Sequence, residues 1–77
     1  MDGIKAYHSK RFILWRVIDD NQRSGTGLVA EGVQFPTGIC VMQWLTDPGS
    51  IGLYKSAQEL IEIHGHGRGT IIKWLDS

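Results

Sequence analysis

The chain has 77 residues, enough for one small domain and too few for two. Eight basic and eight acidic residues cancel, which argues against the overall positive charge of a nonspecific nucleic-acid binder. The single cysteine, Cys40, excludes an internal disulfide and is typical of a buried thiol in a reducing compartment. With no signal peptide and no membrane-length apolar stretch, we expect a cytoplasmic protein.

The first half of the chain is predicted to form strands after a short lead-in. Residues 1–10 are mixed and aperiodic, and residues 11–77 are expected to form one compact domain. Runs of β-branched and aromatic residues, separated by turn-forming residues, indicate the strands. The Pro36-Thr37-Gly38 turn makes the second and third strands a hairpin. The predicted strands are residues 11–18, 26–35, 39–45 and 51–54.

The first predicted strand is apolar on both faces. One face carries Phe12 and Leu14, and the other carries Ile13 and Trp15. A sheet in a small two-layer domain usually leaves one face in water. We therefore expect this strand either in the centre of a closed barrel or at a subunit interface. A chain of this length also buries only a small core, so self-association is the expected source of additional burial.

A helix and a last strand complete the predicted fold. Ser56 and Glu59 match a capping box, and Gly65 is expected to end the helix. The final strand is predicted over residues 70–75. The order β-β-β-β-α-β indicates an α+β domain, a small curled antiparallel sheet or partial barrel with one helix packed on it. The residues that share the buried helix face are Ala57, Leu60, Ile61 and His64.

The segment His64-Gly65-His66-Gly67-Arg68-Gly69 suits an anionic ligand. Glycines allow close approach of the backbone, and an arginine fork with imidazole donors can hold a phosphate. His66, Gly67 and Arg68 are therefore candidate ligand-binding residues. One alternative is a simple turn that ends the helix. Another is a metal site on His64 and His66, which lacks a third ligand nearby, so no metal or cofactor is expected.

A second glycine loop, Ser24-Gly25-Thr26-Gly27, lacks the Gly-Lys-Ser/Thr ending of a phosphate-binding P-loop. Arg23, Ser24 and Thr26 are candidate donors to a phosphate or ribose, and the alternative is a bulge or turn. Trp44 is the candidate to stack on a base. No spacing selects a nucleophile and its base, so no catalytic residue is assigned and an enzyme is the less favoured class.

Several motifs occur together along residues 11–76. They are Phe12-x-Leu14, SGTG at residues 24–27, VAEGV at 29–33, Trp44-Leu45, HGHG at 64–67 and Trp74-Leu75-Asp76. This series resembles a family of small uncharacterised proteins from phages and from actinobacterial and archaeal genomes. The resemblance implies a phage-like context and brings no assigned chemistry with it.

The predicted function is small-molecule binding. We expect a phage-type protein that sequesters a phosphorylated, nucleotide-like signal of host defence without turnover, as a homo-oligomer with pockets near the subunit boundary. A protein-interaction or structural module without a ligand is the first alternative. A small metal-dependent nucleotide hydrolase using His64 and His66 is the second. Neither a membrane nor a nucleic-acid polymer is an expected partner.

Overall fold

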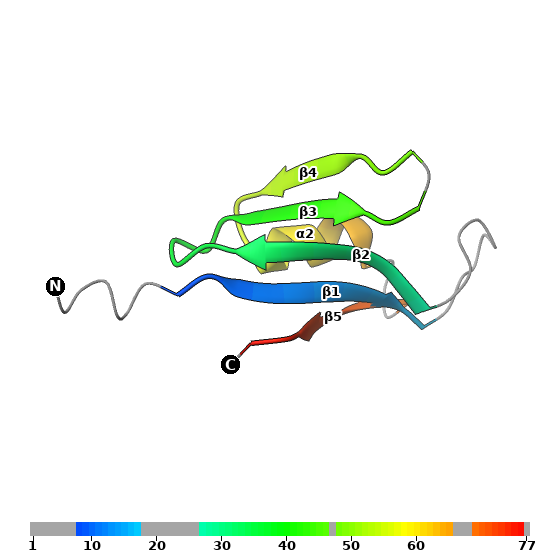
Figure 1. Ribbon diagram of the computed structural model, residues 1–77, viewed down its shortest axis with the longest axis horizontal. Coiled ribbons are helices and arrows are strands. Elements are labelled where there is room, and N and C mark those ends of the chain that lie inside the picture. Colours follow the sequence, from blue (N-terminus) through cyan, green and yellow to red (C-terminus); the bar gives the residue numbers. More distant parts are fainter. Residues whose placement is uncertain (1–7, 18–26, 47, 66–68, 77) are drawn as a thin grey trace, which may run out of the picture.

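The computed structural model describes residues 8–17, 27–46, 48–65 and 69–76 and contains five strands and one helix within them. Every predicted element forms, with ends within two residues of those expected. This confirms the α+β prediction (Figure 1). The elements are β1 (Lys10–Arg16), β2 (Gly27–Gln34), β3 (Cys40–Trp44), β4 (Ile51–Tyr54), α2 (Ala57–His64) and β5 (Thr70–Trp74).

The five strands form one antiparallel sheet in the order β4-β3-β2-β1-β5. Each of the strands β1 to β3 pairs with the strand that follows it in the chain, and the helix carries the chain back so that β5 pairs with β1 (Figure 1). The sheet is open, with β4 and β5 at its edges, so the closed-barrel alternative for the first strand is wrong. β1 instead lies inside an open sheet, between β2 and β5.

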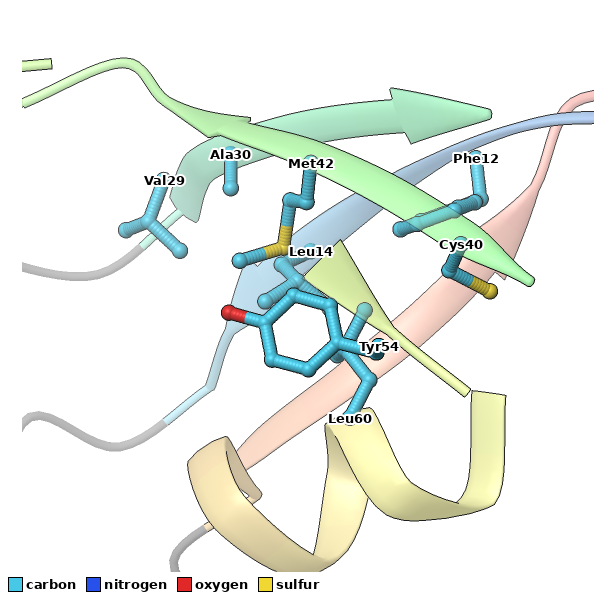
Figure 2. Close-up of a cluster of buried hydrophobic side chains, with 8 residues drawn as sticks. All are labelled: Phe12, Leu14, Val29, Ala30, Cys40, Met42, Tyr54 and Leu60. Carbon is cyan, nitrogen blue, oxygen red and sulfur yellow. The ribbon is translucent and has the colours of Figure 1, made fainter. Parts of the chain in front are cut away.

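One face of the sheet packs against α2 and forms the core (Figure 2). The amphipathic pattern of the helix places Leu60 in this layer, where its side chain is fully buried. Burial of one such side chain contributes about 1.5–3 kcal/mol. Cys40 is also fully buried, as predicted. The buried cluster consists of Phe12, Leu14, Val29, Ala30, Cys40, Met42, Tyr54 and Leu60.

Local hydrogen bonds at both ends of α2 fix its start and its end at the residues that the sequence predicts. The Ser56 hydroxyl accepts from the Glu59 amide at 3.0 Å, and the Glu59 carboxylate accepts from the Lys55 amide at 2.6 Å. The carboxylate thus reaches one residue further back than a standard capping box requires. Gly65 ends the helix in the right-handed region, with φ −70°, and not in the left-handed conformation common for such glycines.

The predicted hairpin turn and a bulge shape the centre of the sheet. Gly38 has a φ of 98°, a conformation that glycine adopts at little cost, and the turn joins β2 to β3 as expected. Between Leu14 and Trp15 the register of β1 against β2 shifts by one residue. The bulge in β2 lets the consecutive residues Val29 and Ala30 both face the core.

The opposite face of the sheet, here called the open face, is covered by no element within the described ranges. Strand alternation and register place its side chains away from α2. Most of these side chains are apolar and partly or largely exposed. The open face consists of Ile13, Trp15, Leu28, Val33, Val41, Ile51, Leu53 and Ile71, together with Arg11, Glu31, Gln43 and Lys73.

Candidate ligand-binding end of the sheet

The two glycine-rich segments attach to the same end of the sheet, on either side of β1. Arg16, the last residue of β1, is in register with Gly27 on one side and with Thr70 on the other. The backbone of Val17 donates to the Gly69 carbonyl at 2.7 Å, which joins the two attachment points directly. This loop-bearing end brings together parts of the chain that are far apart in sequence (Figure 1).

Most of the residues predicted to bind the ligand lie outside the described residues. These are Arg23, Ser24 and Thr26 in the first segment, and His66, Gly67 and Arg68 in the second. Their roles stay predictions, but the topology brings the described residues next to both segments to one end of the sheet. The antiparallel order is the reason, because β1 ends between the start of β2 and the start of β5.

Trp44 lies at the end of β3 on the face covered by α2. Its indole is half-buried, and its ring meets the ring of His64 edge to face, with 5.0 Å between centroids and 81° between planes. The residue therefore packs partly against the core instead of standing free in solvent. Its role in stacking on a base stays a prediction.

Two further residues, Arg16 and Thr70, lie at this end of the sheet and belong to none of the motifs found in the sequence. Alternation along β1 places Arg16 on the covered face after Phe12 and Leu14, and its side chain is half-buried. No ion pair or side-chain hydrogen bond joins it to any other residue that the structure describes. The one pattern that could have pointed to it is a single charged residue on an otherwise apolar strand face.

Thr70 presents an unsatisfied hydroxyl beside Arg16. The residue is 2% exposed, and its Oγ1 has no hydrogen-bond partner, the sole such buried side-chain atom in the described part of the chain. Leaving a buried polar group unpaired costs about 1–3 kcal/mol. A guanidinium and a hydroxyl in neighbouring register positions together supply donors for an anion.

The end of α2 is tied to β4 by a hydrogen bond between Tyr54 and His64. The Tyr54 Oη and the His64 Nε2 are 2.7 Å apart, and the two rings meet edge to face. Burial raises the pKa of the Tyr54 phenol. His64 thus lies at the helix end against the core, as predicted. Within the described ranges, no group of three or more His, Cys, Asp or Glu residues is placed to hold a metal ion.

A groove of about 500 Å³ crosses the open face, on the other side of the sheet from the core. Its polar lining residues are Arg11, Glu31 and Gln43, and most of the remaining lining is apolar. Arg11 is engaged there, because its guanidinium forms a two-pronged pair with Asp76 at 2.9 and 3.0 Å. The groove therefore lies on the opposite face of the sheet from Arg16 and Thr70.

The structure defines a small α+β protein in which two glycine-rich segments attach at one end of the sheet and one face of the sheet is exposed and mostly apolar. The family model described as Acb5 phage protein matches residues 9–76. The chain belongs to the Acb5 phage protein family, which confirms the phage part of the resemblance found in the sequence. Searches of curated proteins and of solved structures gave no significant match. No described helix is long and apolar enough to cross a membrane.

Proposed function

We propose that this phage protein counters host defence by binding and holding a phosphorylated, nucleotide-like ligand in the host cytoplasm, without chemical turnover. One observation carries the proposal. The two donor-rich glycine segments attach on either side of Arg16, next to the unpartnered hydroxyl of Thr70. The ligand's phosphate binds at this loop-bearing end.

The described groups suit binding more than catalysis. Arg16 offers a charge that no other described residue neutralises, and a guanidinium binds phosphate through paired hydrogen bonds. Thr70 offers a donor whose burial without a partner is unfavourable until an acceptor arrives. Arg68 and Arg23, in the adjoining segments, are the proposed additional phosphate donors. Because tight binding alone removes a signal, no bond needs to be made or broken.

Native mass spectrometry tests the proposal directly. The protein is purified from cells that produce cyclic dinucleotides or ADP-ribose derivatives, and retained ligand is identified by its mass. We expect a phosphorylated ligand to be retained and then bound again when the same compound is titrated in a calorimeter. A protein that retains none of these compounds and binds none of them in titration would contradict the proposed function.

Substitutions then locate the site. Thr70→Val removes the hydroxyl at nearly constant volume, and the loss of one such hydrogen bond weakens affinity by about 5- to 100-fold. Arg16→Gln and Arg68→Ala are expected to weaken binding in the same way. Thr37→Val, at the exposed β2–β3 turn, is the matched control and is expected to bind normally. Unchanged affinity in both Thr70→Val and Arg16→Gln would place the ligand elsewhere.

Thermal melting separates a binding role from a structural one. Because the Thr70 hydroxyl has no partner in the folded protein, Thr70→Val should melt at the same temperature as the wild type or higher. Arg68→Ala is likewise expected to leave the melting temperature nearly unchanged. Early melting of Thr70→Val would assign its hydroxyl to the fold instead.

A further inference from the structure

The open face exposes large apolar side chains on several of its strands. On the strands beside β1, Leu28 and Ile71 are 48% and 39% exposed, and they flank the half-buried side chain of Trp15. Contiguous apolar patches of this kind mark sites of protein association. Among the described residues, the core on the other face contains eight buried apolar residues, so a second buried layer would add substantially to the stability of the chain.

We propose that the open face binds a second copy of this chain, with a two-fold axis that runs along β1. The proposal concerns how the protein assembles and is independent of the identity of the ligand. It follows from three properties of the face. These are the balance of its charges, the order of side chains across its rows, and the ion pair that neutralises Arg11.

The charges of the open face favour self-association over other partners. Glu31 and Lys73 are opposite in sign, and Arg11 is neutralised by its two-pronged pair with Asp76. A face with balanced charge lacks the positive field that attracts nucleic acid or an anionic membrane surface. A second copy supplies the same apolar side chains and the same two opposite charges, so its surface is complementary in kind.

The row of side chains through Ile13 is complementary to the same row of a second copy when the two copies are related by an axis along β1. Glu31 on β2 and Lys73 on β5 are both in register with Ile13, one strand away on either side. Adjacent strands lie about 4.8 Å apart, so the two charges flank Ile13 at equal distances. Rotation by 180° about an axis along β1 exchanges the two sides. Glu31 of each copy then lies opposite Lys73 of the other.

The neighbouring row, through Trp15, is also complementary to itself about this axis, here through apolar side chains. Leu28 and Ile71 flank Trp15 in register, again on β2 and β5. The same rotation sets Leu28 of one copy against Ile71 of the other, and Trp15 against Trp15. Lys73 already extends over the Trp15 ring, with Nζ 4.3 Å from the ring centroid, so its ammonium is held on this face.

A two-fold axis that runs across the strands would place like charges opposite each other. When it passes through the row of Ile13, it sets Glu31 opposite Glu31 and Lys73 opposite Lys73, and like charges at an interface are unfavourable. The axis along β1 avoids both repulsions. With this axis, the contact is formed by the faces of β2, β1 and β5. Strands β3 and β4, including Leu53, lie outside it.

Charge reversal tests the arrangement, with mass in solution measured by light scattering and sedimentation at micromolar concentration. The wild-type protein is expected to be a dimer. Glu31→Lys and Lys73→Glu should each weaken it by about tenfold or more, because each change places two like pairs at the interface. The double variant should restore dimerisation to near the wild-type value. All four proteins should fold, since both side chains are exposed.

Leu53→Glu is the matched control, because Leu53 belongs to the same face but lies on β4, outside the proposed contact. It is expected to dimerise like the wild type. A monomeric wild-type protein would overturn the proposal. Failure of the double variant to recover, or dissociation caused by Leu53→Glu and not by the charge reversals, would overturn the proposed axis. Binding of phosphorylated ligand by the monomeric variants separates this result from the proposed function.

Discussion

The phenol oxygen of Tyr54 lies 2.7 Å from Nε2 of His64, and this contact joins the edge strand β4 to the last turn of α2. Tyr54 is buried, so its hydroxyl depends on this partner for a hydrogen bond. His64 in turn contacts Trp44 at the end of β3. The three rings therefore connect the helix end to two strands near the loop-bearing end of the sheet.

Replacement of His64 is expected to destabilise the fold. His64→Ala removes the partner of the Tyr54 hydroxyl and leaves a buried polar group unpaired, which costs about 1–3 kcal/mol. Chemical denaturation measures the change in unfolding free energy. His8→Ala, which removes an exposed imidazole, is the control and should unfold like the wild type. Equal stability of the two variants would show that the contact does not hold the helix end.

Gly52 is expected to tolerate no side chain, because the ring of Tyr54 lies along β4 above it. A Cβ at Gly52 would collide with the phenol of Tyr54, and relief requires that ring, which is hydrogen-bonded to His64, to shift. We expect Gly52→Ala to destabilise the protein by about 1–3 kcal/mol, the usual cost of overpacking. A double-mutant cycle with Tyr54→Ala measures the coupling. If the two losses simply add, the ring is not the obstacle.

The Cys40 thiol should react slowly in the native protein. Its side chain is fully buried, and burial raises the pKa of the thiol above its usual 9.0, which reduces the reactive thiolate. A chromogenic disulfide reagent added to native and to denatured protein gives the two rates. We expect labelling to accelerate on denaturation. Rapid labelling of the native protein would contradict the burial of β3.

Stability should fall at acid pH through Asp76. Its pairing with Arg11 lowers the pKa of the Asp76 carboxyl from 3.8 to about 2. Because the folded value is the lower one, the stabilisation is complete above the unfolded value and is lost as the pH falls toward about 2. Asp76→Asn should weaken the pH dependence of unfolding in this window.

Glu62→Gln serves as the control for this acid effect, because it removes an exposed carboxylate from α2 and leaves the Arg11 pair intact. We expect this variant to keep the slope of the wild type between about pH 4 and pH 2. A wild-type slope in Asp76→Asn as well would assign the acid sensitivity to other carboxyl groups.

The predicted site was only partly accessible to sequence reasoning. The glycine segments and their donors are predicted from the sequence because glycine, histidine and arginine are unusual in such a cluster, and their roles stay predictions. Arg16 and Thr70 are not predicted, because neither lies in a motif and they are 54 positions apart in the chain. The pairing of β1 with β5 makes them neighbours.

The amino-acid sequence by itself determined the strands, the helix and the turns of this protein. The capping pair at Ser56, the turn glycine Gly38 and the alternation in each strand act through hydrogen bonds and steric limits within a few residues. It also determined that β1 is apolar on both faces, because Ile13 and Trp15 alternate with Phe12 and Leu14. One helix can cover only one of these two faces.

Only the tertiary structure decided that β5 pairs with β1 and which face of the sheet α2 covers. Several pairings satisfy the same local alternation, and the choice among them depends on how much apolar surface the whole chain buries at once. The insertion of β1 between β2 and β5 set Arg16 beside Thr70 on one face. The same choice placed Glu31 and Lys73 on either side of Ile13 on the other, because register is a property of paired strands and not of either strand alone.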